Sequence, residues 1–393
     1  MGEGQGEGHL NPKSKIRNSK LQKLPPLLLD WFAREARDLP WRRTRDPYAI
    51  WVSEIMLQQT QVKTVIPYWE RWMRELPTIE ALARAKPEKI HKLWEGLGYY
   101  TRVRNMQKAA GQIMEVGRQK AEGRNKSEPP HVVSYKFPCE FEDVLALPGI
   151  GRYTAGAICS IAFNQPTPIL DGNVIRVLTR IFGIAENPRE KKTNEQLWDL
   201  ATGLVHHASR IVHPASCSHL NQSLMELGAL VCTPKNPRCH ICPVKRHCTA
   251  LKDGRIDALP NLGKRTAATA RHFVAFVVER DGKFLVRQRP AGIVNAHLWE
   301  FPNLEVNGAG ASPTELFREH FAVEPLQVQP LHTVKHSITR YRITLEAFHV
   351  RTSKTPATPS GTWLPSSGFG ALAFTAAHKK LASLAANRML SGR

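Results

Sequence analysis

Between two segments of helical pattern lies Leu147-Pro148-Gly149-Ile150-Gly151, in which a proline is followed by two glycines. The apolar segment 152–162 follows, so the sequence predicts a helix, a tight glycine hairpin and a second helix. Gly149 and Gly151 leave backbone amides accessible at the start of that second helix. Such amides bind phosphate without reading bases, so the hairpin is a candidate clamp for a nucleic-acid strand as well as a plain helix–helix turn.

The charge of the whole chain favours the same kind of partner. Among 393 residues, 55 Lys and Arg exceed 34 Asp and Glu, which gives a formal net charge of +21. A chain of this length is not a peptide hormone, and with 42% apolar residues it is not a disordered polymer. No apolar run reaches the ~18 residues of a membrane-spanning helix, and no signal-peptide core opens the chain. We therefore expect an intracellular protein that binds DNA or RNA and no membrane.

The hydrophobic pattern predicts a helical domain first. Residues 1–22 are rich in Gly, Lys and Asn and predict a flexible basic tail. The domain then covers 23–251, and a Gly- and Pro-containing stretch over 118–138 predicts an exposed loop inserted in it. We expect helices over 25–37, 48–57, 61–75, 79–93, 100–116, 152–162, 173–182 and 218–231.

A second, smaller α+β domain is predicted over 271–385, after a linker at 252–270. Its first two strands are joined by Asp281-Gly282, a strong hairpin signal. The fold class is therefore a multi-domain chain, all-α and then α+β. We expect strands over 272–280, 283–288, 326–335 and 340–350 and a helix near 313–321.

Four of the seven cysteines crowd into one short loop of the helical domain, 232–248. Their spacing, Cys-x6-Cys-x2-Cys-x5-Cys, has a single short knuckle with longer arms. Structural zinc sites usually show two knuckles, so this pattern favours a [4Fe–4S] cluster over zinc. The candidate ligands are Cys232, Cys239, Cys242 and Cys248.

Two carboxyl groups of the helical domain have opposite surroundings. Asp171 opens an apolar helix, where an N-cap position favours its anion. Glu54 lies in a segment that is apolar nearly all round, so burial should raise its pKa and keep it an acid. An acid paired with an anion is the arrangement that breaks glycosidic bonds. For either carboxyl alone, a structural role is an equally good interpretation.

Several motifs together resemble one family, the adenine DNA glycosylases of the helix-hairpin-helix superfamily. They are Ser53-Glu54-Ile55-Met56-Leu57-Gln58-Gln59-Thr60, Gly96-Leu97-Gly98-Tyr99-Tyr100, the hairpin, Asp171-Gly172-Asn173-Val174 and the cysteine loop. The resemblance covers about 25–250. It implies a DNA N-glycosylase of base excision repair that flips adenine out of double-stranded DNA when adenine is mispaired with 8-oxoguanine or guanine.

The resemblance also implies roles at the reaction centre. Glu54 takes the place of the acid that protonates adenine N7 and later activates water, and Asp171 that of the anion that stabilises the oxocarbenium ion or forms a transient adduct. Tyr153 stands where endonuclease III-like relatives carry a Schiff-base lysine, so we expect a monofunctional enzyme without strand cleavage. Asn173 is expected beside the two carboxylates.

Other positions of the resemblance concern the bases. Arg42 and Gln222 correspond to residues that line the adenine pocket. Gln59 and Tyr99 correspond to wedge residues that fill the gap beside 8-oxoguanine. Without the resemblance, each is an ordinary surface polar residue or, for Tyr99, part of an aromatic packing pair.

The second domain resembles the Nudix-like domain of the same family, through Asn295-Ala296-His297-Leu298-Trp299-Glu300-Phe301-Pro302. The segment after Arg318-Glu319 lacks the clustered glutamates that hold Mg²⁺, so we expect no pyrophosphohydrolase activity. In the family a Phe-Ser-His tip on a β-loop searches for 8-oxoguanine. Here the aligned residues are Val334-Lys335-His336, so His336 is a candidate lesion-reading residue or an ordinary strand histidine.

Two other functions compete with this interpretation. An endonuclease III-like glycosylase and lyase for oxidised pyrimidines is disfavoured by Tyr153 and by the second domain. A DNA-binding protein without catalysis is disfavoured by the presence of both Glu54 and Asp171. We expect a monomer on DNA.

Overall fold

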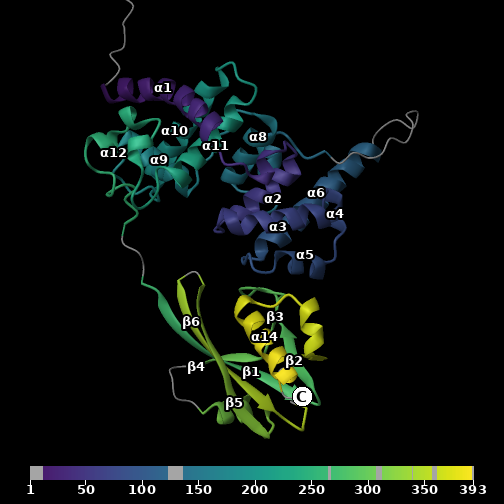
Figure 1. Ribbon diagram of the computed structural model, residues 1–393. Helices are drawn as coiled ribbons and strands as arrows, with labels where there is room; N and C mark the ends of the chain where they lie inside the picture. Colours follow the sequence, from purple (N-terminus) through teal and green to yellow (C-terminus); the bar gives the residue numbers. More distant parts are fainter. Residues whose placement is uncertain are drawn as a thin grey trace, which may run out of the picture. The chain divides into compact units, whose positions relative to one another are not determined.

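The computed structural model describes residues 12–122, 136–263, 267–306, 312–338, 340–355 and 361–391. Its contacts divide the chain into two compact units (Figure 1). The first consists of Met1–Ala83 and Lys108–Lys264 and is helical; the second consists of Arg84–Gln107 and Arg265–Arg393 and holds the β-sheet. The fold class is as predicted from the sequence. The two units do not follow the predicted limits everywhere: 84–107 groups with the second unit, and the predicted linker 252–270 is divided between the two units after Lys264.

The helical unit has a core formed by α1, α8, α9, α10 and α11, to which Leu28, Leu178, Leu204 and Leu224 contribute fully buried side chains. Its helices follow the apolar periodicity of the sequence closely. They are α1 (Pro12–Glu35), α2 (Pro47–Leu57), α3 (Val62–Glu75), α4 (Ile79–Arg84), α6 (Thr101–Glu122, shared with the second unit), α7 (Phe141–Leu145), α8 (Arg152–Phe163), α9 (Gly172–Phe182), α10 (Lys191–Ser209), α11 (Ser216–Leu230) and α12 (Thr249–Lys252).

Several segments differ from expectation, among them the predicted helix 79–93, which the structure divides into α4 and a separate helix over Pro87–Trp94. Helix α1 begins at Pro12, inside the predicted basic tail, because Leu21 continues the apolar stripe of Leu24 and Leu28 into the core. Helix α6 reaches Glu122, so only 123–135 of the predicted loop lies outside the described residues. Helix α10 was missed by the sequence reasoning. Among the described residues, none of the helices has the length and apolarity needed to cross a bilayer.

The glycine hairpin has the predicted form. Helix α7 ends at Leu145, Gly149 adopts φ +78°, and Gly151 is the N-cap of α8. The amide of Ile150 donates to the carbonyl of Leu147 at 3.1 Å, which closes the turn. A Cβ placed on Gly151 would meet no atom within 4 Å, so the start of α8 is open to an approaching ligand.

The second unit is built on a mixed seven-stranded sheet with the order β3-β2-β1-β6-β5, to which β4 adds beside β1 and β7 beside β2. Asp281 and Gly282 both have positive φ, as the predicted two-residue hairpin between β1 and β2 requires. β1 and β6 run parallel. The strands are β1 (Thr269–Arg280), β2 (Lys283–Gln288), β3 (Trp299–Glu300), β4 (Asn303–Val306), β5 (Gln327–Ile338), β6 (Tyr341–Arg351) and β7 (Thr362–Pro365).

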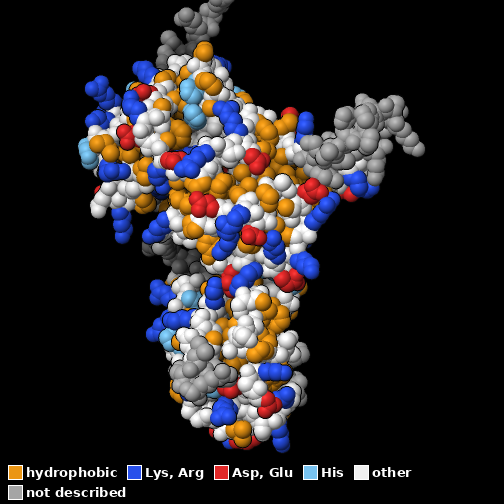
Figure 2. Space-filling model, turned by 45° about the vertical axis from the view of Figure 1, so that its right-hand side comes forward, with side chains coloured by type: hydrophobic (Ala, Val, Ile, Leu, Met, Phe, Trp, Pro, Cys, Tyr) orange, Lys and Arg blue, Asp and Glu red, His pale blue; other side chains and the backbone are white. Residues whose placement is uncertain are grey.

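Strand β1 alternates between two cores. Ala275 and Val277 pack on one face with α14 (Ala376–Ser391), and Val274, Phe276 and Val278 pack on the other with α13 (Pro313–Phe321). Helix α5 (Pro87–Trp94) also belongs to this unit. On the face of the molecule visible in Figure 2, lysine and arginine side chains are spread over the surface, as the net charge of +21 predicts.

Candidate active site and cysteine loop

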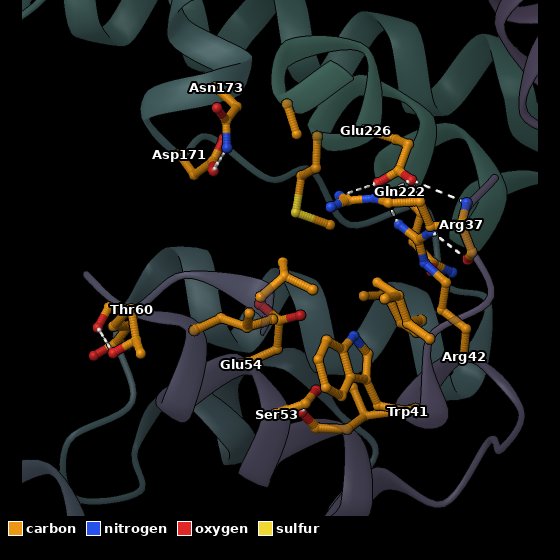
Figure 3. A pocket seen from close by; sticks show the side chains of 18 of the residues that line it. Arg37, Trp41, Arg42, Ser53, Glu54, Thr60, Asp171, Asn173, Gln222 and Glu226 are labelled. Carbon is orange, nitrogen blue, oxygen red and sulfur yellow. Dashed lines mark hydrogen bonds and ion pairs between the residues drawn. The ribbon is translucent and has the colours of Figure 1, made fainter. Parts of the chain in front are cut away.

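One pocket of the helical unit brings together the predicted catalytic and adenine-pocket residues and one predicted wedge residue. It has a volume of about 540 Å³, within the range of small-molecule sites. α2, α8, α9, α11 and the short 3-10 helix Pro40–Arg42 each contribute to its wall. Figure 3 shows Glu54 facing this space from one side and Asp171 and Asn173 from another. The predicted residues that line it are Arg42, Glu54, Gln59, Tyr153, Asp171, Asn173 and Gln222.

Glu54 is buried on α2, with 5% of its surface exposed. The helix starts at Asp46, whose carboxylate caps the amides of Tyr48 and Ala49, and it is apolar on all sides. The hydroxyl of Tyr153 donates to Oε2 of Glu54 at 2.7 Å. Burial raises the pKa of Glu54 to about 7, although the Tyr153 hydrogen bond acts in the opposite direction. The carboxyl therefore exchanges a proton near neutral pH.

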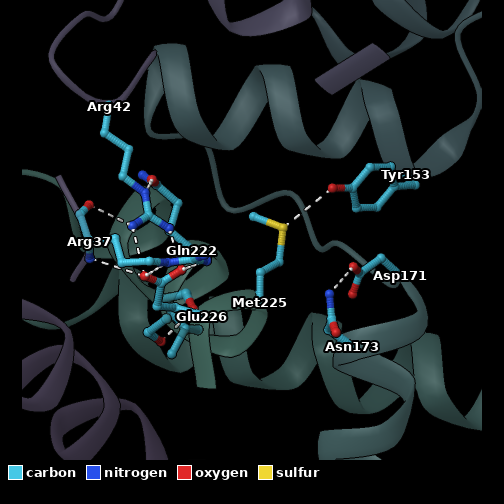
Figure 4. A network of polar contacts seen from close by, with 10 residues as sticks. Arg37, Arg42, Tyr153, Asp171, Asn173, Gln222, Met225 and Glu226 are labelled. Carbon is cyan, nitrogen blue, oxygen red and sulfur yellow. Dashed lines mark hydrogen bonds and ion pairs between the residues drawn. The ribbon is translucent and has the colours of Figure 1, made fainter. Parts of the chain in front are cut away.

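Asp171 is the N-cap of α9. Its Oδ1 accepts from the amide of Val174 at 2.7 Å and its Oδ2 from Nδ2 of Asn173 at 3.0 Å (Figure 4). Burial nevertheless raises the pKa of Asp171 above its ordinary value. The N-cap hydrogen bond acts in the opposite direction and favours the anion, as the sequence predicts, whereas the burial comes from elements distant in the chain and was not predicted. Asp171 in turn adds to the raised pKa of Glu54, so the two carboxyls interact.

Glu226, which the sequence reasoning missed, forms the other charged part of the pocket (Figure 4). It is 1% exposed on α11, and its carboxylate accepts from Nε and Nη2 of Arg37 at 2.7 Å each and from Nη2 of Arg42 at 2.9 Å. Burial alone would raise the pKa of Glu226, but these bonds lower it to about 2. Nε of Arg42 also donates to Oε1 of Gln222 at 3.0 Å. The spacing of Gln222 and Glu226, one helical turn apart, was the available sequence signal.

Four predicted DNA-binding residues do not line this pocket: Tyr99, Gly149, Gly151 and His336. His336 lies within β5, opposite Ile343 of β6, and is half-buried, so Val334-Lys335-His336 is part of a strand rather than a loop tip. Burial lowers the pKa of His336.

The two predicted wedge residues share a backbone feature. Gln59 has φ +60° and Tyr99 has φ +47°, a left-handed conformation that residues other than glycine seldom adopt. Tyr99 is also 46% exposed. Such conformations cost free energy and persist only where the surrounding structure enforces them. Residues that adopt them cluster at functional sites.

The four loop cysteines line one small pocket together with apolar residues of α9 and α11. A donor set of four thiols around a common space fits an iron–sulfur centre. Nη1 of Arg180 donates to Sγ of Cys232 at 3.4 Å. Nε of Arg176 donates to the carbonyl of Cys232 at 2.7 Å, and its Nη2 to Oδ1 of Asn173 at 2.8 Å, so Arg176 joins the loop to the pocket.

Three family models match this chain. The HhH-GPD superfamily base excision DNA repair protein model matches 52–202, the iron–sulfur binding domain of endonuclease III matches 232–248, and the NUDIX domain matches 273–384. The match of the cysteine loop decides between zinc and iron–sulfur. The chain therefore has a [4Fe–4S] cluster domain at this loop, and Cys232, Cys239, Cys242 and Cys248 are the residues that would hold the cluster through their thiolates.

Curated relatives match along most of the chain. The adenine DNA glycosylase of Rattus norvegicus is 36% identical over 90% of this chain and 76% of its own length, and that of Homo sapiens is 34% identical over 90% and 72%. The bacterial enzyme of Buchnera aphidicola (subsp. Schizaphis graminum) is 36% identical over 71% and 74%. The chain is thus a DNA N-glycosylase of the helix-hairpin-helix base excision repair superfamily, and it belongs to the adenine DNA glycosylase family.

Proposed function

We propose that this protein is a monofunctional glycosylase that removes adenine mispaired with 8-oxoguanine or guanine from duplex DNA. The observation that carries the proposal is the meeting of Glu54, Tyr153 and Asp171 in one pocket, with a carboxyl whose pKa is raised to about 7. A protonated Glu54 delivers its proton to the flipped adenine, which makes the base a better leaving group. As the bond between the base and C1′ breaks, Asp171 stabilises the positive charge that develops on the sugar. Water then adds to C1′ and gives a proton to the Glu54 carboxylate, which restores the acid and leaves an abasic site.

The opposite wall of the pocket holds the base in this proposal. Gln222 keeps its amide oriented by two bonds, since Arg42 donates to its oxygen and its nitrogen donates to Oγ of Ser218 at 3.1 Å. Glu226 fixes Arg42 in turn. A fixed amide is suited to read the edge of an adenine.

The absence of strand cleavage rests on Tyr153. A lyase reaction needs an amine to form a Schiff base, and no lysine is among the residues lining the pocket in the described part of the chain. A phenol whose pKa is raised well above its ordinary value by burial is a poor nucleophile at neutral pH. The product is then an intact strand with an abasic site.

The proposed substrate also indicates the binding partner and the cellular location of the enzyme. We infer that the enzyme acts as a monomer on chromosomal DNA inside the cell, where such mispairs arise. Tyr99, His336 and the hairpin at Gly149 and Gly151 are the proposed contacts outside the pocket.

Single-turnover base release tests the proposal. The duplexes contain adenine opposite 8-oxoguanine, guanine or thymine, and strand breaks are scored before and after alkali. We expect fast release opposite 8-oxoguanine, slower release opposite guanine and breaks that depend on alkali. Breaks without alkali would refute the monofunctional assignment. Release of oxidised pyrimidines instead of adenine would replace the substrate by that of an endonuclease III-like enzyme.

A further inference from the structure

Glu95 is a buried carboxylate of the second unit that the proposed chemistry does not use. It is 7% exposed and directly precedes the loop Gly96–Tyr99. It is also the C-cap residue of α5, where the helix dipole disfavours a negative charge. Within its own helix Lys92, one turn earlier, offsets part of this cost, and partners from elsewhere in the chain supply the rest.

Those partners come largely from the Nudix-like part of the unit. Oε1 of Glu95 accepts from the amide of Phe374 at 3.1 Å, and Oε2 accepts from Nζ of Lys379 at 2.7 Å and Nζ of Lys92 at 3.0 Å. Lys92 also donates to the carbonyl of Leu372 at 3.0 Å. Burial would raise the pKa of Glu95, but the two lysines lower it below its ordinary value, so the group is an anion at neutral pH.

The loop after Glu95 is held in an unusual shape. Gly96 and Gly98 have φ of +111° and +69°, and Tyr99 has φ +47°. The carbonyl of Gly98 accepts from Nε1 of Trp94 at 3.0 Å and from Nη2 of Arg102 at 3.2 Å. These bonds fix the turn itself, and the ring of Tyr99 is left 46% exposed.

A second contact with the Nudix-like part is made by α6, directly after the loop. Nη1 of Arg104 donates to the carbonyl of Ala296 at 3.1 Å, in the segment that precedes β3. The loop thus lies between two anchors, Glu95 before it and Arg104 after it, and both bind backbone groups of the Nudix-like part. Glu95 is the stronger anchor because it is charged, buried and bonded to three donors.

We propose that Glu95 is a positioning residue that fixes the Tyr99 loop to α14 and the segment before it in the Nudix-like part, so that the unit carrying His336 also aims Tyr99 at the base opposite the excised adenine. This rests on the proposed wedge role of Tyr99. The Nudix-like part then acts on specificity by holding the wedge as well as by any contact of its own with the lesion.

The first test measures the loop itself in the full-length holoprotein. In Glu95→Gln, which keeps the shape and loses the charge, we expect amide hydrogen exchange at 96–100 to accelerate by roughly tenfold or more, while the amides of α9 keep their protection. Lys379→Gln should give a smaller acceleration of the same amides. The exposed Glu88→Gln on α5 is the control. Unchanged exchange at 96–100 in Glu95→Gln would overturn the proposal.

The second test is a double-mutant cycle with Tyr99→Ala, read as single-turnover adenine release opposite 8-oxoguanine. We expect Glu95→Gln alone to slow release by roughly fivefold to tenfold and to have no further effect in the Tyr99→Ala background. An equal cost in both backgrounds would make Glu95 merely structural and overturn the proposal. If Tyr99→Ala alone leaves release unchanged, the wedge role fails, and the exchange experiment still decides whether Glu95 positions the loop.

Discussion

The pocket contains two buried glutamates, Glu54 and Glu226, whose chemistry is opposite. Both are at most 5% exposed and both lie on helices of the same unit. Glu54 has one neutral partner, the Tyr153 hydroxyl, and burial raises its pKa to about 7. Glu226 is desolvated as well, but Arg37 and Arg42 lower its pKa to about 2. Partners rather than burial therefore decide which carboxyl keeps a proton.

The difference in pKa indicates a different role for each side of the pocket. A carboxyl that titrates near neutral pH can give and take a proton during a reaction, which a permanently ionised one cannot. Glu226 is suited instead to hold two arginines in fixed positions, and through Arg42 it orients Gln222. In the proposed function, Glu54 lies on the chemical wall, which carries the reaction, and Glu226 lies on the structural wall, which holds the arginines in place. Four experiments separate these two roles.

The largest expected effect is on the reaction. Glu54→Gln removes the proton donor but keeps the size of the side chain, so single-turnover adenine release should fall by roughly 10²–10⁴-fold. Binding to a mispaired duplex should stay close to that of the unaltered protein. Glu70→Gln, an exposed carboxylate on α3, is the control. Normal excision by Glu54→Gln would show that the chemical wall has been wrongly assigned.

Glu226→Gln should act mainly on stability. It leaves the Arg37 and Arg42 guanidiniums without their shared carboxylate, and breaking a buried pair costs about 3–5 kcal/mol in the free energy of unfolding. Denaturant titration measures this. Asp38→Asn, which breaks an exposed pair with Arg43, should leave the midpoint nearly unchanged. If Glu226→Gln unfolded like the unaltered protein and only lost activity, Glu226 would belong to the chemical wall.

The pH dependence of stability should have opposite signs for the two groups. The folded pKa of Glu54 lies above its ordinary 4.5, so its contribution is complete below pH 4.5 and is lost as pH rises through 7. The folded pKa of Glu226 lies below 4.5, so its contribution is present above pH 4.5 and is lost as pH falls through 2.

Unfolding of Glu54→Gln, Glu226→Gln and the unaltered chain across pH 2–8 measures both contributions, each amounting to roughly 3 kcal/mol at 1.36 kcal/mol per pKa unit. Relative to the unaltered chain, Glu54→Gln should gain stability between pH 4.5 and 7. The deficit of Glu226→Gln should shrink as the pH falls below 4.5. If the stability difference from the unaltered chain changed with pH in the same direction for both variants, the contrast between Glu54 and Glu226 would be wrong.

The sequence predicts local features of this pocket and misses distant ones. The apolar neighbours of Glu54 along α2 are enough to predict its raised pKa, and the hairpin and the cysteine loop follow from spacing. Glu226 was missed because the charge that explains it, Arg37, is 189 residues away in the chain. The N-cap at Asp171 favours the anion, as the sequence predicts, but the sequence reasoning did not include the burial by helices from elsewhere in the chain, which raises the pKa of this group. The ion pair between Glu95 and Lys379 likewise joins residues far apart in the chain, so the local sequence does not predict it.

The smallest expected effect is a shift in the pH profile of adenine release. Release by an acidic Glu54 should decline as pH rises above its pKa of about 7. The hydroxyl of Tyr153 donates to Glu54 and lowers that pKa, so Tyr153→Phe should move the declining limb upward by roughly one pH unit or less and slow release by roughly fivefold. Tyr68→Phe, which removes a phenol outside the pocket, should leave the limb in place. A downward shift in Tyr153→Phe would mean that the phenol stabilises the protonated acid rather than its anion, and the two walls would then differ by more than the charge of their partners.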